Sequence, residues 1–315
     1  MLTTVGRVTG LPVVVTLVVS LLPGLATGQT RSPNPPRTPW GDPDLQGPWN
    51  NGTIVPLERP ASLGDRETLT DEEVAERAQE SSDLLFSPRG VGFYNEFWFE
   101  YGKDTNRTSL VIGRPDGRLP ALTPEAHQRL ENLSAHRREV SRSPSTYLDF
   151  DVYARCIGRG LPGAMMNAYI NNNYLILQTP DYVVLVLELM HDARIIPLDG
   201  RPHPPSSIQQ WLGDSRGHWE GDTLVVETTN LTGKVSELAA TVFGIGEHLR
   251  LVERFTWVDA DTIDYRYTVT DPTTYTEDFT VALPMNRIDG PLYEYACHEG
   301  NYAMANVLRG ARSAQ

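Results

Sequence analysis

Six segments that alternate apolar and polar residues decide the fold class of this chain. They are YLILQT (174–179), YVVLVLELM (182–190), TLVVETT (223–229), LRLVERFTWV (249–258), TIDYRYTVT (262–270) and DFTVAL (278–283). A period of two places every second side chain on the same face, which is typical of a strand with one buried face. Turns separate the segments and no long helical pattern lies between them, so we expect antiparallel pairing. The sequence therefore predicts a mainly β fold, as an antiparallel lipocalin-like barrel or a curled sheet with an N-terminal arm and two short helices.

The residues before these strands predict a targeting segment, a linker and an N-terminal arm. Residues 1–28 carry one charge before an apolar stretch and end on small residues, which is typical of a signal peptide. An uncleaved membrane anchor is the alternative, but the uninterrupted apolar run is shorter than the roughly 20 residues that span a bilayer. The proline-rich segment 29–39 predicts an irregular linker. Residues 40–150 predict an arm of short helices and first strands, which forms one domain with the barrel body at 151–315.

Two capping signals predict the short helices of the arm. Thr70 with Glu73 three positions later forms a capping box for a helix that ends before Pro88. A second helix begins after Thr123, which precedes a proline, and runs to about Val140.

Charge and cysteine content restrict the partners and the compartment. The net charge of −13, with no cluster of Lys or Arg, excludes nucleic acid and anionic membranes as favoured partners. We expect a periplasmic or secreted protein with no stable membrane association after cleavage of the signal. In such a compartment Cys156 and Cys297 predict one disulfide that closes a long loop; two buried free thiols are the alternative. Neither cysteine has a CxxC partner, which argues against redox catalysis.

Long blocks of the chain resemble a large family of exported proteins of soil bacteria. The blocks are WGDPDLQGPW (40–49), NNNYLILQTPDYVVLVLELMHDARIIPLDGRPH (171–203), WEGDTLVVETTN (219–230), LVERFTWVDADT (251–262) and YACHEGNY (295–302). The resemblance implies a bacterial source, secretion and a β-rich body. It carries no catalytic residues across.

Ionisable residues that interrupt an apolar strand are the first candidates for chemistry. Interpreted as one strand, 182–196 places Ile195 on a core face and Glu188 and Arg194 on the other face. We expect Glu188 and Arg194 to be a binding pair for a polar ligand group near a barrel mouth, with His191 on the adjoining edge. The alternative is a solvated face with an ordinary cross-strand ion pair.

Two further residues are candidates for acid–base work. Glu253 shares a strand face with Leu251 and Phe255, where an unpaired carboxylate is costly and where a general acid or base is commonly found. The alternatives are an exposed face, or an Arg from a neighbouring strand that pairs with Glu253. His298 is held in place by the predicted disulfide at Cys297 and is a candidate proton shuttle, or else a capping residue of a final helical segment.

Aromatic side chains on the strands predict ligand contacts in the barrel interior. Small barrels with such interiors commonly bind one apolar ligand, although most aromatic residues simply fill the core. The candidates are Tyr174, Trp257, Tyr265 and Tyr267, with Phe97 from the alternating segment FYNEFWFEY (93–101). We predict no metal and no cofactor, because the seven histidines show no close ligand spacing.

These observations favour a barrel that binds a small, largely apolar molecule. Whether it also acts as a lyase, isomerase or hydratase through Glu253, His191 or His298 is left open. One alternative is an extracellular hydrolase of carbohydrate or ester with Glu188 and Glu253 as paired carboxylates about 5–10 Å apart. The other is a structural or interaction protein with a filled barrel.

Overall fold

The computed structural model describes residues 34–86, 98–100, 102, 104–234 and 247–314. All of them belong to one compact unit, Pro33–Gln315. The predicted signal peptide 1–28, the first part of the predicted linker and Phe97 lie outside the described residues.

The described residues form eleven strands, and most of the strand positions agree with the alternating segments. The strands are β1 (Gly47–Asn50), β2 (Val111–Ile112), β3 (Asn173–Gln178), β4 (Tyr182–Leu187), β5 (Ala193–Pro197), β6 (Asp214–Glu220), β7 (Thr223–Thr229), β8 (Arg250–Asp259), β9 (Thr262–Thr270), β10 (Phe279–Ala282) and β11 (Met285–Arg287). The helices are α1 (Asp71–Phe86), α2 (Pro124–Val140) and α4 (Ala303–Ser313), with 3-10 turns at Ala61–Leu63, Tyr147–Asp149, Gly163–Met165 and Leu189–His191.

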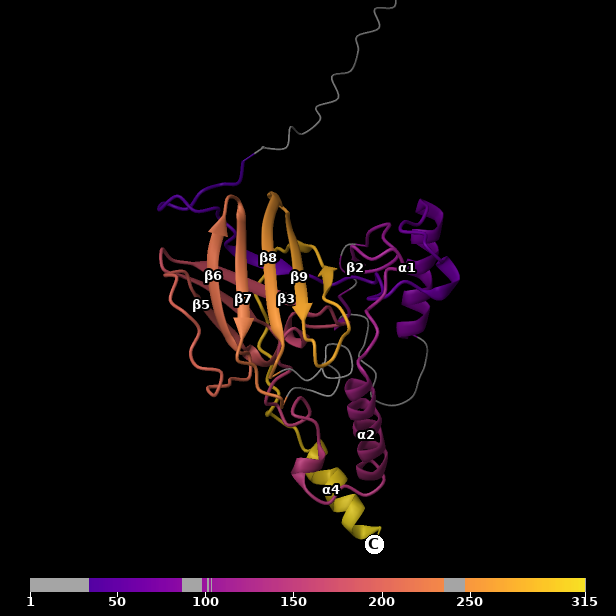
Figure 1. The fold of residues 1–315 in the computed structure, drawn as a ribbon. Helices are drawn as coiled ribbons and strands as arrows, with labels where there is room; N and C mark the ends of the chain where they lie inside the picture. The colour runs from indigo at the N-terminus through magenta and orange to yellow at the C-terminus, as the bar shows by residue number, and fades with distance from the viewer. Residues whose placement is uncertain (1–33, 87–97, 101, 103, 235–246, 315) are drawn as a thin grey trace, which may run out of the picture. The chain divides into compact units, whose positions relative to one another are not determined.

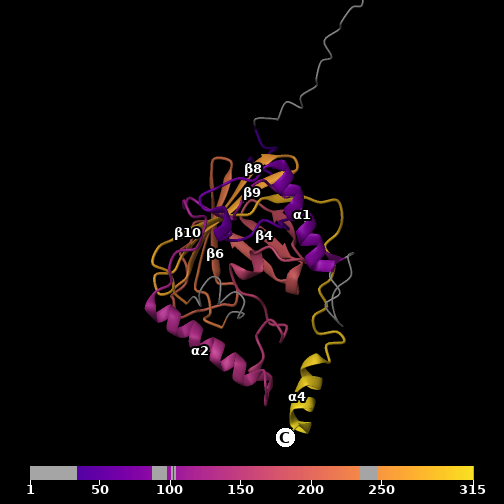
Figure 2. The same cartoon turned by 90° about the vertical axis from the view of Figure 1, so that its right-hand side faces the viewer.

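The strands make one antiparallel sheet that curls into a nearly closed barrel, which confirms the predicted fold class. Along the hydrogen-bonded path the order is β5-β4-β3-β1-β11-β9-β8-β7-β6, and β10 and β2 extend from β9. Figure 1 shows β6, β7, β8 and β9 side by side as the long strands of one wall. The helices α1, α2 and α4 lie outside the sheet, as both views show (Figures 1 and 2). The two predicted helices are confirmed, and α4 extends the short helical segment considered for the C-terminus.

The path has nine strands, and every neighbouring pair along it is antiparallel. Because direction alternates at each step, an odd number of strands makes the first and last, β5 and β6, run the same way. The two lie next to each other, but no backbone hydrogen bond joins them in the part of the chain that the structure describes. The barrel therefore has one seam, between β5 and β6, which side chains close. A Cβ built on Gly217 of β6 would lie 2.8 Å from methyl groups of Ile196 and Leu198, so the strands approach closely there.

The barrel interior is filled by the alternating apolar positions. On β8 the side chains of Leu251, Glu253 and Phe255 are fully buried, and on β9 those of Tyr265 and Tyr267 are buried opposite them. Phe255 and Tyr265 stack with ring centroids 4.6 Å apart. The inward face of β8 therefore follows the pattern expected from the sequence.

The interpretation of 182–196 as one strand is wrong. The chain turns between β4 and β5, and Met190 and His191 adopt positive φ angles in the turn. The turn reverses the inward and outward positions, so that Ile195 is 64% exposed and Arg194 is buried.

The predicted arm is partly built into the barrel. Strand β1 lies between β3 and β11 in the sheet, and its Trp49 is fully buried. Most of the strand predicted at 93–101 lies outside the described residues, and 98–100 do not form a strand.

Candidate functional site

A pocket of about 630 Å³ lies where the start of β3 meets the segment after β11. Its described lining residues are aromatic, acidic or amide-bearing for the most part: Trp98, Glu100, Ile170, Asn171, Asn173, Glu188, Tyr293, Glu294, Tyr295, Ala296, Cys297 and Asn301. We call it the carboxylate pocket, because Glu100 and Glu188 organise it.

Glu100 is held by an unusual number of donors. Its Oε1 accepts from the backbone N–H of Asn171 at 3.0 Å and from Nδ2 of Asn173 at 3.2 Å. Its Oε2 accepts from the backbone N–H of Asn172 at 2.8 Å, from Nδ2 of Asn172 at 2.9 Å and from Nδ2 of Asn50 at 2.9 Å. Five donors on one carboxylate use essentially all of its acceptor capacity.

Glu188 is 3% exposed and sits beside Glu100. It accepts from Nδ2 of Asn171 at 2.9 Å, from Nδ2 of Asn173 at 3.0 Å and from the backbone N–H of Tyr293 at 3.0 Å. Because both carboxylates accept from the same Nδ2 of Asn173, their nearest oxygens lie within about 6 Å of each other. No Lys or Arg of the described residues forms a salt bridge with either carboxylate. Within the described part of the chain, the donors to both carboxylates are therefore amide N–H groups.

The local sequence explains how three consecutive asparagines serve this cluster. Asn171 has φ of +59°, a left-handed conformation that Asn tolerates better than most residues. This bend aims the successive N–H groups of Asn171 and Asn172 at Glu100, while Asn172 Oδ1 accepts from the N–H of Ala168 at 2.6 Å. After the bend, Asn173 begins β3.

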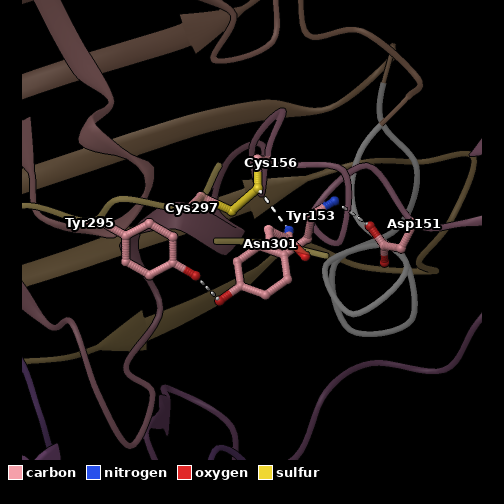
Figure 3. The surroundings of a disulfide bond; sticks show 6 residues. All are labelled: Asp151, Tyr153, Cys156, Tyr295, Cys297 and Asn301. Atoms are coloured by element: carbon pink, nitrogen blue, oxygen red, sulfur yellow. Dashed lines mark hydrogen bonds between the residues drawn. A yellow bond between two sulfur atoms is a disulfide. The ribbon is translucent and has the colours of Figure 1, made fainter. Parts of the chain in front are cut away.

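The predicted disulfide is confirmed, and it fixes one wall of the pocket. Cys156 and Cys297 are bonded across a sequence separation of 141. Figure 3 shows Tyr153 and Tyr295 meeting through their hydroxyls beside the bond, 3.1 Å apart. Nδ2 of Asn301 also donates to the Cys156 sulfur at 3.6 Å. The segment that carries Tyr293–Cys297 is thereby tied to the body.

The two candidate histidines have different surroundings. His191 is exposed, and its Nε2 accepts from the backbone N–H of Tyr295 at 2.9 Å, so it supports the pocket wall from outside. His298 is exposed and does not line the pocket, although it lies next to Cys297. The structure therefore does not place His191 and His298 together with Glu188 in one site.

Arg194 pairs with Glu253 in the barrel interior and not with Glu188. Nη1 of Arg194 donates to Oε1 of Glu253 at 2.8 Å, and Nη2 donates to Oε2. Both side chains are buried, at 1% and 0% exposure. The hydroxyl of Tyr265 donates to Glu253 Oε1 at 2.9 Å. This is the pairing that the sequence left as an alternative, but the Arg comes from across the barrel instead of from a neighbouring strand.

Burial and the neighbouring Glu253 together shift the pKa values of Arg194 and Tyr265. Desolvation lowers the pKa of Arg194, but the attraction and hydrogen bonding of Glu253 outweigh it and hold the pKa above its ordinary value. Burial, with the charge of Glu253 second, raises the pKa of Tyr265 well above its ordinary value. The phenol therefore stays a hydrogen-bond donor.

The predicted ligand-contacting aromatics belong mostly to the packed interior. Tyr174, Tyr265 and Tyr267 are at most 2% exposed, and Trp257 is half-buried against the same core. Phe97 lies outside the described residues. None of the four described aromatics lines the carboxylate pocket. Sequence reasoning missed Glu100, Trp98 and Tyr293, although the run of asparagines before β3 was a visible signal.

A second pocket, of about 550 Å³, lies at the barrel seam. It is lined by Asp192 and Arg194 from the β5 side and by Gln209–Ser215 from the β6 side. Burial raises the pKa of Asp192 to about 6. In the described ranges no three His, Cys, Asp or Glu side chains gather in a metal-binding arrangement, and no described helix has the length and apolarity to cross a bilayer.

Comparison with protein-family models gave no match, and comparison with curated proteins gave none either. The family resemblance noted in the sequence therefore stays a prediction.

Proposed function

We propose that the chain is an exported protein that binds a small molecule in the carboxylate pocket. The observation that carries this proposal is the pocket itself: about 630 Å³, lined by the aromatic rings of Trp98, Tyr293 and Tyr295 together with a few convergent polar groups. Ligand sites typically measure about 300–1,000 Å³ and combine apolar walls with a small number of placed polar groups. A barrel fold is compatible with such binding.

The barrel interior supports this location better than a ligand inside the lumen. The side chains of Trp49, Phe255, Tyr265 and Tyr267 are buried there, and the Arg194–Glu253 pair is buried too. A ligand in the lumen would have to displace these side chains. The pocket outside the lumen needs no such rearrangement, and the disulfide at Cys297 keeps its wall in place.

Hydrolysis of a glycoside is the second candidate, and one distance favours it. The shared donor Asn173 keeps the nearest oxygens of Glu100 and Glu188 within about 6 Å, a limit that includes the spacing of about 5–5.5 Å in retaining glycosidases. Glu253, the partner expected from the sequence, does not line this pocket. The donors on Glu100 and Glu188 weaken this candidate, since a carboxylate whose oxygens are all occupied is a poor nucleophile and a poor base.

Native mass spectrometry of the full chain, expressed with export into a periplasm, tests the binding function. We expect a reproducible extra mass of small-molecule size on the folded protein. Replacement Ala296→Trp places an indole in the pocket and should abolish that mass, while Ala303→Trp, on exposed α4 outside the pocket, should retain it. A bound mass that survives Ala296→Trp would contradict this location. Release of reducing sugar from oligosaccharides, lost in Glu188→Gln, would favour the hydrolase instead.

A further inference from the structure

We propose that the ligand of the carboxylate pocket carries an alkylated ammonium group, tertiary or quaternary. This inference rests on the proposed binding function and names the chemical class of the ligand. Three features of the described residues support it: the sign of the charge, the state of the acceptors, and the aromatic rings.

The described lining of the pocket is acidic and includes no cationic side chain. Glu100, Glu188 and Glu294 line it, and none of its described lining residues is Lys, Arg or His. Buried carboxylates are usually paired with a cation. Among the described residues, the donors to Glu100 and Glu188 are neutral amide groups. The negative potential of the two carboxylates therefore extends into the pocket and attracts a positively charged ligand.

The carboxylates of Glu100 and Glu188 can attract a cation, but few of their lone pairs are free to accept further hydrogen bonds. Glu100 accepts five hydrogen bonds from protein donors, and Glu188 accepts three. A primary amine or a sugar needs free acceptors for its N–H or O–H groups, as does a metal ion that binds six or more oxygens. An alkylated ammonium group needs none or one, because its attraction to the carboxylates is Coulombic. The hydrogen-bonding state therefore favours this class of cation.

Three aromatic side chains line the same pocket. Trp98 is 48% exposed and Tyr293 is 60% exposed, and Tyr295 lines the pocket next to them. The faces of indole and phenol rings attract cations, and quaternary ammonium ligands are commonly bound by such rings. Exposed aromatic side chains beside buried acids give a ligand cation both kinds of contact.

Isothermal titration calorimetry with two isosteric probes tests the inference. Choline carries a quaternary ammonium, and 3,3-dimethylbutan-1-ol has a neutral carbon in its place. We expect choline to bind the full-length protein at least about tenfold more tightly than the neutral isostere, since both carboxylates attract its unit charge. The affinity for choline should fall as NaCl is raised.

Glu→Gln variants test which carboxylates contribute to the affinity for choline. Glu188→Gln should lower choline affinity by about tenfold or more. Should that variant fail to fold, Glu294→Gln removes an exposed carboxylate of the pocket and should lower the affinity about two- to fivefold. Glu299→Gln, an exposed glutamate of the same segment outside the pocket, should change nothing.

The outcomes separate this inference from the proposed function. The inference of a cationic ligand is refuted if the two probes bind with equal affinity. It is also refuted if neither Glu188→Gln nor Glu294→Gln changes the affinity for choline. A neutral molecule identified by native mass spectrometry and displaced by Ala296→Trp overturns it too, but leaves the binding function standing. Absence of any bound mass and of binding by either probe refutes both.

Discussion

Removing Arg194 should destabilise the barrel far more than removing any exposed arginine. In the variant Arg194→Met, Glu253 stays buried, and the Tyr265 hydroxyl is the one donor that it keeps among the described residues. Two charge centres about 4 Å apart attract each other by about 4 kcal/mol at an effective dielectric of about 20. Breaking a buried ion pair on one side typically costs about 3–5 kcal/mol. We therefore expect the free energy of unfolding to fall by about 4 kcal/mol.

The cost should come from the charge that is left behind and not from lost packing. Met fills much of the volume of the Arg side chain, and replacing both members of a buried pair is often neutral. The double variant Arg194→Met with Glu253→Gln should therefore recover most of the loss, with a coupling free energy of about 2–4 kcal/mol. Urea unfolding followed by tryptophan fluorescence, with the disulfide intact, measures the free energy of unfolding of Arg194→Met, Glu253→Gln and the double variant.

The matched control is Arg254→Met on β8, the strand that carries Glu253. Arg254 pairs with Glu220 at 2.8 Å, but both side chains are almost half exposed, so no measurable loss is expected. A loss below about 1 kcal/mol for Arg194→Met would refute the reasoning. So would a double variant as unstable as the sum of the two single variants, since the residues would then not be coupled.

Three other predictions concern stability. Replacing Cys156 and Cys297 together by Ala should lower the free energy of unfolding by about 3–5 kcal/mol, because the bond closes a loop with a sequence separation of 141; an unchanged urea midpoint would contradict the entropic argument. Asp192 has a pKa of about 6 when folded and about 4 when unfolded, so stability should fall as pH rises through that window, by about 1 kcal/mol after allowance for its partial exposure. Asp192→Asn should remove that slope, and equal slopes in urea titrations of both proteins would refute it. Gly217→Ala should cost about 1–3 kcal/mol, because the new methyl group would lie 2.8 Å from Ile196, which is buried; a neutral result would show that the seam can widen.

The fold was predictable because the evidence for it is local. Alternation along β8 groups Glu253 with Leu251 and Phe255 on one face, which the structure buries. The presence of only two cysteines leaves one possible intramolecular disulfide. The turn between β4 and β5 left no comparable signal. Its positive φ angles fall on Met190 and His191 instead of on Gly or Asn, so a continuous strand was the natural interpretation and Arg194 was assigned to the wrong face.

The site was less predictable because its contacts are distant in the sequence. Arg194 and Glu253 are 59 residues apart, and Glu188 and the N–H of Tyr293 are 105 residues apart. Glu100 lies in a segment whose aromatic alternation suggested a strand. Its role follows only from the donors of the asparagine run, which the fold brings to it. Contacts between such distant residues depend on the register and curvature of the sheet. The alternation of residue types along single strands does not determine either.

The odd number of strands gives the Arg194–Glu253 pair a structural reason to exist. Since β5 and β6 run in the same direction at the seam, no antiparallel ladder closes the barrel, and side chains must do so. Arg194 leaves β5 and donates to Ser215 on β6, to Thr228 on β7 and to Glu253 on β8. One guanidinium, with donors fixed in a plane, therefore connects the free edge to three successive strands of the opposite wall. Apolar side chains of equal volume could fill this space with similar stability, but they would not specify which residues meet across the seam. The buried charge is thus better explained by the register of closure than by its contribution to stability. The same role accounts for the three hydrogen bonds that Glu253 accepts, two from Arg194 and one from Tyr265.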